Sequence, residues 1–106
     1  MTIDKALTQI IAGNDLSQEE TRKVFDEIMS GDATAAQIAG ILIGLRVKGE
    51  AVSEITGATI AMRKVSTKVN IEVDYLVDTC GTGGSGSNKL FNISTAAAFV
   101  TAAAGA

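Results

Sequence analysis

A run of glycine, threonine, serine and asparagine, residues 81–88 (GTGGSGSN), stands between two apolar segments. The segment before it, residues 75–80, has the length and composition of a strand, and the segment after it opens on Asn92-Ile93-Ser94-Thr95, which is typical of a helix start. Glycines let the backbone turn tightly and approach a ligand closely. The free N–H groups and the positive dipole end of the following helix favour a phosphate group. The order strand, glycine-rich loop, helix therefore predicts an anion site that acts on a phosphorylated small molecule.

Four stretches ahead of this loop carry apolar residues at helical spacing. Capping-box patterns at Ser17-x-x-Glu20 and Thr34-x-x-Gln37 open the second and the third stretch. Glycines near the ends of the first three stretches indicate where those helices stop. The helices are expected over residues 3–12, 18–30, 35–48 and 52–65.

The third of these stretches also has a stripe of small residues, Ala36, Gly40 and Gly44. Glycine inside a helix costs about 1 kcal/mol relative to alanine, so this spacing needs a compensating contact. A close crossing with another helix of the same chain is favoured, and a subunit contact is the alternative.

Composition excludes several classes of protein. The chain has 106 residues, 9 basic and 12 acidic side chains and a net charge of −3, without the basic patch of a nucleic-acid-binding protein. With no histidine and one cysteine, Cys80, neither an internal disulfide nor a Cys/His zinc site is possible. There is no run of 18 apolar residues and no signal-type start, so we expect no membrane contact and a cytoplasmic location.

The distribution of charge predicts that the last part of the chain belongs to a larger protein. Residues 79–106 contain a single charged side chain, Lys89. A helix over residues 96–104 has no polar face and should be buried all round, and a lone strand needs partner strands. The expected fold class is therefore α/β with an N-terminal all-α helical domain. A helical bundle over residues 1–68 and a connector over 69–74 precede the first strand, glycine-rich loop and helix of a truncated α/β domain over 75–106.

The loop is neither a dinucleotide fingerprint nor a Walker A motif, because its glycine spacing differs and no Gly-Lys-Ser/Thr triplet closes it. By spacing alone, it is a phosphate-binding loop or a flexible surface connection. The small hydrogen-bonding side chains of Asn92, Ser94 and Thr95 favour the first interpretation, although they could equally cap the helix.

Residues 77–84 (VDTCGTGG) and 92–100 (NISTAAAFV) closely resemble the anthranilate phosphoribosyltransferase family. The helical part agrees through residues 34–39 (TAAQIA), 45–50 (LRVKGE) and 54–58 (EITGA). The resemblance covers essentially the whole chain.

The resemblance implies a reaction in which the nitrogen of anthranilate displaces pyrophosphate from C1 of phosphoribosyl pyrophosphate, a step of tryptophan biosynthesis. It implies Mg²⁺ with the diphosphate and a homodimer formed through the helical domains. Backbone N–H groups and a metal can stabilise a leaving pyrophosphate without proton transfer, which suits a chain without histidine.

The resemblance also implies a set of substrate-binding residues, with no catalytic residue among them. Gly81 and Gly84 would lie against phosphoribosyl pyrophosphate, Gly81 also near anthranilate, and the Ser94 hydroxyl would be a magnesium ligand. The full set is Gly81, Gly84, Ser85, Lys89, Asn92, Ile93, Ser94 and Thr95.

The chain departs from the family pattern at the loop. Ser85 stands where the family usually has Asp, and one extra residue lies between the loop and Asn92. Lys89 is a solvated loop residue or an added cation for a phosphate. Cys80 is interpreted as a small core residue.

The family's later Lys-His-Gly-Asn segment, its anthranilate arginine and its acidic magnesium pair are expected beyond Ala106, so the chain alone should show no turnover. Two other functions stay open: a pyrimidine nucleoside phosphorylase-like enzyme, and a non-catalytic helical dimerisation module.

Overall fold

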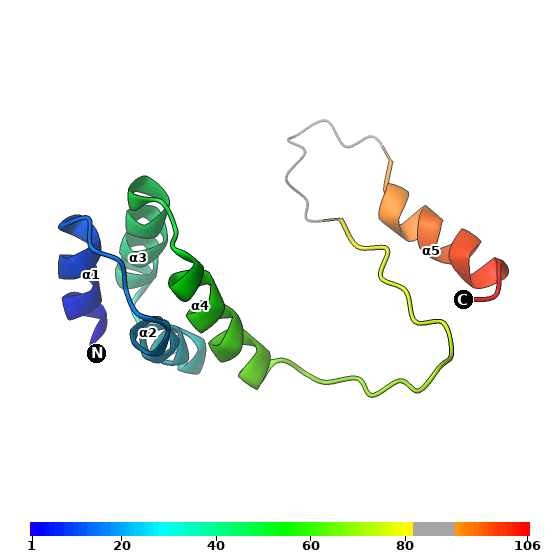
Figure 1. Cartoon of the computed structure of the whole chain (residues 1–106), viewed down its shortest axis with the longest axis horizontal. Coiled ribbons are helices and arrows are strands. Elements are labelled where there is room, and N and C mark those ends of the chain that lie inside the picture. Colours follow the sequence, from blue (N-terminus) through cyan, green and yellow to red (C-terminus); the bar gives the residue numbers. More distant parts are fainter. Residues whose placement is uncertain (82–90) are drawn as a thin grey trace. The chain divides into compact units, whose positions relative to one another are not determined.

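Helices α1 (Ile3–Ile11), α2 (Gln18–Ser30), α3 (Ala35–Lys48) and α4 (Val52–Val65) make up the first unit of the protein, Met1–Lys68 (Figure 1). The computed structural model describes residues 1–81 and 91–106. A second unit, Val69–Ala106, contains α5 (Ile93–Ala103). The helix boundaries predicted from the periodic pattern are confirmed to within a residue or two.

Both predicted capping boxes form. The Ser17 hydroxyl accepts the Glu20 N–H at 3.3 Å, and the Glu20 carboxylate accepts the Ser17 N–H at 2.9 Å. Thr34 and Gln37 make the same reciprocal pair at the start of α3. Gly31 ends α2 with a φ of 86°, a left-handed conformation that favours glycine. These local signals explain why the sequence predicted the helices well.

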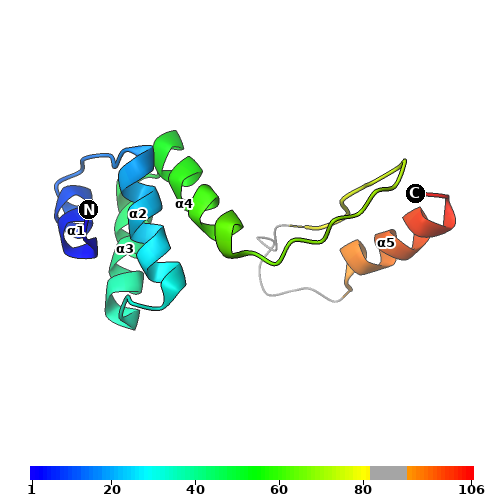
Figure 2. The same cartoon turned by 90° about the horizontal axis from the view of Figure 1, so that it is seen from below.

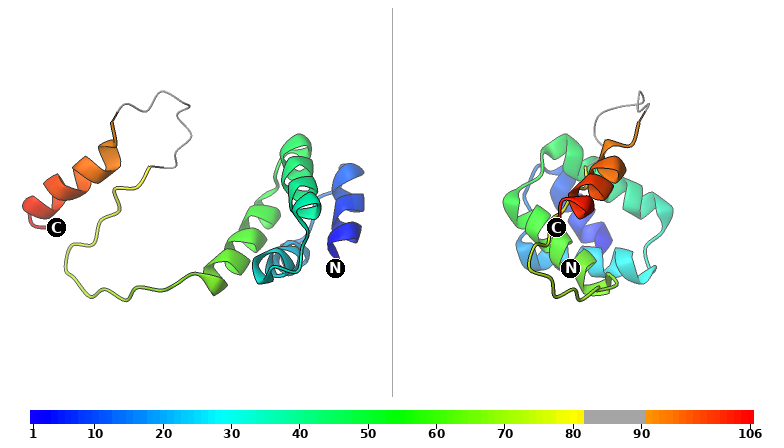
Figure 3. Two further views of the ribbon diagram at one scale, coloured as in Figure 1. Left: turned by 180° about the vertical axis from the view of Figure 1, so that it is seen from behind. Right: turned by 90° about the vertical axis from the view of Figure 1, so that its right-hand side faces the viewer.

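The helices of the first unit pack in pairs, α2 against α4 and α1 against α3 (Figures 2 and 3). Each helix turns a limited apolar stripe inward, and these stripes share one core. The core consists of Ile3, Ala6, Ile10, Leu16, Val24, Phe25, Ile41, Leu45 and Ala61.

The glycines of α3 and α4 lie where helices approach most closely. A Cβ built on Gly44 would stand 2.8 Å from Ile10 Cγ2, and one on Gly40 would stand 3.1 Å from Leu7 Cδ2. The stripe on α3 is thus an intrachain crossing with α1, the favoured prediction. On α4, a Cβ at Gly57 would collide with the Gln18 carbonyl oxygen and stand 3.0 Å from the Arg22 nitrogen, so backbone meets backbone at the α2–α4 crossing.

The helical spacing of Ile55, Ala58, Thr59 and Met62 predicts that these residues form the inward face of α4, but the structure buries a different face. Glu54, Gly57 and Ala61 are the buried residues of α4, whereas Ile55 is 56% and Met62 50% exposed. The reason is the close α2–α4 approach, which leaves room only for small side chains on the inward face.

Glu54 is a charged residue in the interior, with 1% of its surface exposed. Its carboxylate accepts the N–H groups of Leu16 at 2.9 Å and Ala51 at 2.7 Å, and Lys48 Nζ lies 3.0 Å away. Burial by itself raises the pKa of this carboxyl, but the two N–H donors and Lys48 outweigh it and lower the pKa below the usual 4.5. Glu54 thereby connects the α1–α2 loop, the end of α3 and the start of α4.

The second unit, taken by itself, has one helix, α5, beside the segment 69–81. The strand expected over residues 75–80 is absent, since the described residues 1–81 and 91–106 form helices as their only regular elements. A strand requires a neighbour to take its backbone hydrogen bonds, and no described segment provides one.

Helix α5 is exposed in this structure, as expected if the residues that would bury so apolar a helix belong to a larger protein. Phe99 is 75% and Val100 70% exposed, and α5 has no buried residue. Within the second unit, the described part of the chain offers α5 only the segment 69–81 as a packing partner. Among the described residues, every helix falls short of the length and apolarity that crossing a membrane requires.

Replacing Gly57 with alanine should destabilise the helical unit by about 2 kcal/mol, because the added methyl group meets backbone atoms of α2 that cannot rotate away. Gly40→Ala is the matched control. Its methyl group meets only the end of the Leu7 side chain, and alanine gains about 1 kcal/mol of helix propensity, so the change should be neutral or stabilising. Urea unfolding followed by circular dichroism measures both variants, and equal destabilisation would contradict the crossing.

Replacing Glu54 with glutamine should cost about 1–3 kcal/mol at pH 7, because Lys48 loses its buried partner and keeps only the exposed Asp15 as an ion-pair partner among the described residues. The folded-state pKa of Glu54 is lowered, so its contribution is complete above the ordinary pKa and disappears as pH falls through the lowered value. The difference between wild type and Glu54→Gln should therefore shrink as the pH is lowered below about 4.5. Glu19→Gln is the control. The pKa of Glu19 is also lowered, to about 2, but its side chain is 57% exposed, so this variant should lose less stability than Glu54→Gln. A difference for Glu54→Gln that stays constant from pH 7 to pH 2 would contradict the assignment.

Candidate functional site

Helix α5 begins with a side-chain cap from Asn92. Its Oδ1 accepts the Thr95 N–H at 2.9 Å, and its backbone carbonyl accepts the Ala96 N–H at 3.2 Å. The cap uses the acceptor end of the Asn92 amide, while the Nδ2 donors at the other end are chemically independent of it. The start of α5 is thus a defined helix N-terminus with the partial positive charge of its dipole.

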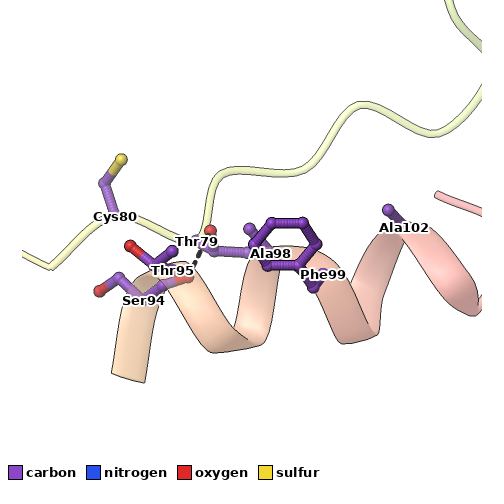
Figure 4. Close-up of a pocket in the computed structure, with 7 residues that line it drawn as sticks. All are labelled: Thr79, Cys80, Ser94, Thr95, Ala98, Phe99 and Ala102. Atoms are coloured by element: carbon purple, nitrogen blue, oxygen red, sulfur yellow. Dashed lines mark hydrogen bonds between the residues drawn. The ribbon is translucent and has the colours of Figure 1, made fainter. Parts of the chain in front are cut away.

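Thr79 connects the segment before the loop to this helix start. Its hydroxyl donates to the Ser94 carbonyl oxygen at 3.3 Å, a bond drawn as a dashed line in Figure 4. Beside the bond lies an open cleft of about 420 Å³. It is lined by Thr79, Cys80, Ser94, Thr95, Ala98, Phe99 and Ala102.

Gly81 and Ser94 are neighbours in this arrangement. A Cβ built on Gly81 would stand 3.3 Å from the Ser94 hydroxyl oxygen, which is tighter than an ordinary contact. Any larger residue at position 81 would press on this hydroxyl, so glycine leaves space between the backbone and the Ser94 hydroxyl.

Asp78 shapes the backbone just before Gly81. Its Oδ1 accepts the Cys80 N–H at 2.8 Å, the local bond of an Asx turn. The bond from the Cys80 backbone lowers the pKa of Asp78, so the carboxylate is ionised at neutral pH. The same carboxylate raises the pKa of the Cys80 thiol.

Cys80 is exposed, so its interpretation as a small core residue was wrong. Its sulfur points away from α5 (Figure 4), and none of the described residues covers it. A raised pKa keeps the thiol protonated at neutral pH, which makes it a poor nucleophile.

The structure brings together part of the predicted set of site residues. Gly81, Asn92, Ser94 and Thr95 lie at or beside the start of α5. Ile93 is 72% exposed at the same turn. Gly84, Ser85 and Lys89 lie outside the described residues, so their predicted contacts stay predictions.

Sequence reasoning missed Asp78 and Thr79. An Asp side chain often accepts a hydrogen bond from the backbone N–H two residues further on, so the position of Asp78 before a glycine-rich run was a local signal for a turn. The partner of Thr79 lies 15 positions further on, and no local pattern reveals that contact.

The described residues by themselves offer a magnesium ion too few ligands to hold it, so an ion here would need further ligands. Mg²⁺ takes oxygen ligands in octahedral geometry and retains several waters. Ser94 offers one hydroxyl oxygen beside Gly81, and the described ranges contain no group of three acidic, cysteine or histidine side chains that could hold a metal. The other ligands would have to come from phosphate oxygens, water or residues outside the described part of the chain.

The comparisons with known proteins agree with this division and this motif. Residues 4–66 match the helical bundle domain of a glycosyl transferase family, and residues 73–106 match the α/β domain of the same family. The chain is 59% identical over 105 residues to the anthranilate phosphoribosyltransferase of Teredinibacter turnerae, and 60% identical over 105 residues to that of Cellvibrio japonicus. Each of these two matches covers 99% of this chain but only 30% of the relative's length.

A further anthranilate phosphoribosyltransferase, from Alkalilimnicola ehrlichii, is 51% identical over 106 residues. The match covers all of this chain and 31% of the relative's length. These matches confirm the resemblance to anthranilate phosphoribosyltransferases that residues 77–84 and 92–100 indicated. Because the helical bundle match alone covers more than half of the chain, this protein belongs to the glycosyl transferase family that combines such a bundle with an α/β domain.

Proposed function

We propose that this chain forms the N-terminal part of an anthranilate phosphoribosyltransferase, which transfers the phosphoribosyl group from phosphoribosyl pyrophosphate to anthranilate. The observation that carries the proposal is identity of 59% and 60%, over 99% of the chain, to relatives that bear this name. We further infer a helical domain over residues 1–68, a connector over 69–74 and the start of an α/β domain over 75–106.

The chemistry of the proposed reaction suits the residues at the start of α5. The C1–O bond to pyrophosphate breaks and the oxygen keeps the electron pair, while the amino nitrogen of anthranilate forms the new bond to C1 and then loses a proton. The N-terminus of α5 and the Ser94 hydroxyl favour the negative charge that grows on the leaving group. Mg²⁺ bound to the diphosphate would neutralise part of that charge, with Ser94 as one of its ligands.

Gly81 contributes through its small size. It lies against Ser94, so a phosphate group held by the helix start can also approach the backbone before the loop. Gly84, Ser85 and Lys89 are proposed to extend this contact, and anthranilate is proposed to bind near Gly81. The names of the relatives favour this activity over a nucleoside phosphorylase.

We propose a homodimer formed through the helical unit. A groove of about 480 Å³ runs between α1 and α3 and includes Ile11, Ile43 and Val47, which are 81%, 63% and 82% exposed. A contiguous exposed apolar patch of this kind marks an interaction surface, and a twofold axis could bury it against its own copy.

The chain alone should form no phosphoribosyl-anthranilate, whereas a chimera should. In the chimera, residues 1–106 replace the matching 30% of the Teredinibacter turnerae relative. The fluorescence change on anthranilate consumption measures turnover. An inactive chimera that is folded and whose parent enzyme is active would contradict the proposal, and so would turnover by the isolated chain.

Within the chimera, Ser94→Ala should lower kcat/KM by about 10- to 100-fold, because a hydrogen bond to a charged group contributes about 1.5–3 kcal/mol. Ser66→Ala is the matched control. Ser66 bonds the Arg63 carbonyl at the end of α4, so this variant should keep the parent rate. Equal rates for the two variants would remove Ser94 from the site.

Replacing Ile43 with glutamate should convert the dimer to a monomer, because a charge at this position cannot be buried against a second copy without a partner. Sedimentation equilibrium of the whole chain measures the mass. Ile55→Glu on α4 is the control, since Ile55 is similarly exposed at 56% but does not line the α1–α3 groove. Dissociation by both variants, or by Ile55→Glu alone, would contradict this interface.

A further inference from the structure

Two hydrogen bonds fix the backbone immediately before the glycine-rich run. Asp78 Oδ1 accepts the Cys80 N–H at 2.8 Å, which closes a tight turn. Thr79 Oγ1 donates to the Ser94 carbonyl at 3.3 Å, which attaches that turn to the first turn of α5. The bonds start from adjacent residues and act on different neighbours, one within the segment and one across to the helix.

We propose that Asp78 and Thr79 are positioning residues, a clamp that holds Gly81 against Ser94 so that both can contact one diphosphate group. The inference rests on the proposed function, because it assigns these residues to the site where phosphoribosyl pyrophosphate would bind. Neither residue touches the substrate in this assignment; each acts through Gly81 or Ser94.

The clamp matters because it sets the separation between Gly81 and the Ser94 hydroxyl. A Cβ added to Gly81 would stand 3.3 Å from the Ser94 hydroxyl oxygen, so the Gly81 backbone lies beside that hydroxyl with little room for a side chain between them. A diphosphate gripped from two sides is sensitive to this separation, since misplacement by about 1 Å can cost on the order of 100-fold in rate. Without the bond between Thr79 and Ser94, the separation would depend on exposed side chains.

Among the described residues of the second unit, few other contacts could replace the clamp. The apolar side chains around it are largely exposed, Leu76 at 69% and Phe99 at 75%, so packing contributes little to this geometry. Thr79 is partly buried between the segment and α5, and its hydroxyl bridges the two. The lowered pKa of Asp78 fits a carboxylate that keeps its N–H bond at neutral pH.

Paired substitutions in the chimeric enzyme separate the clamp from general stability. Thr79→Val removes the hydroxyl with little change in shape, and Thr79→Ser keeps it. Asp78→Ala removes the acceptor oxygen, and Asp78→Asn keeps one. Thr101→Val removes a threonine hydroxyl elsewhere on α5 and is the matched control.

The expected result is a rise in KM for phosphoribosyl pyrophosphate of about three- to tenfold for Thr79→Val and for Asp78→Ala, as for the loss of one hydrogen bond. Thr79→Ser, Asp78→Asn and Thr101→Val should stay within about twofold of the parent, a margin of less than about 0.5 kcal/mol. A purely structural role would lower the active fraction, and with it the apparent kcat, while KM stayed constant. Unchanged KM values for Thr79→Val and Asp78→Ala in an active enzyme would overturn the clamp and leave the proposed function standing.

An inactive but folded parent chimera would instead count against the proposed function, and the clamp then needs a readout without turnover. The ¹H–¹⁵N spectrum of the whole 106-residue chain provides one. Thr79→Val should shift the amide signals of Gly81 and of residues at the start of α5, whereas Thr79→Ser should leave them near their original positions. Identical spectra for Thr79→Val and the parent chain would overturn the clamp on its own.

Discussion

Glu54 places a carboxylate with 1% exposure at the point where the α1–α2 loop meets the start of α4. A buried charge is tolerated only when hydrogen bonds and an opposite charge offset its lost hydration. Leu16, Ala51 and Lys48 provide these groups, and they come from three different segments. The three segments must therefore be in place together, which couples the α1–α3 pair to the α2–α4 pair in one cooperative unit.

The close crossing at Gly57 follows from the same arrangement. With the start of α4 held to Leu16, its inward face at Gly57 meets the backbone of α2 at Gln18. Small residues fill the contact, so the larger apolar side chains of α4, such as Ile55 and Met62, point outward. The helical unit thus has a buried core of its own and still exposes apolar side chains on α4 and along the α1–α3 groove. This surplus of apolar surface is typical of a domain that associates with something else.

The helices were predictable from the sequence because their signals are local. The capping residues Ser17 and Thr34 lie three positions from their partners. The roles of Glu54 and Gly57 were not predictable, since Glu54 bonds a residue 38 positions away and Gly57 responds to a backbone contact with α2. The prediction of a strand at residues 75–80 was wrong for a related reason, because a strand needs hydrogen-bonding neighbours that its own sequence does not encode. At the candidate site, a motif predicts Asn92 and Ser94, whereas Thr79 becomes a candidate through a contact with a residue 15 positions away that only the fold creates.

Capping and ligand binding at the start of α5 are compatible rather than competing roles. Asn92 caps through Oδ1, which orders the first turn and leaves a different part of the amide for a ligand. An ordered turn is what electrostatic catalysis needs, because fixed donors stabilise developing charge without reorganising during the reaction. If the proposed function holds, the part of the site formed by these residues contributes by such placement, and its contribution depends on how firmly its donors are held. Because the apolar side chains described in the second unit are mostly exposed, that firmness comes, among the described residues, from the hydrogen bonds of Asp78 and Thr79 before the loop and of Asn92 after it.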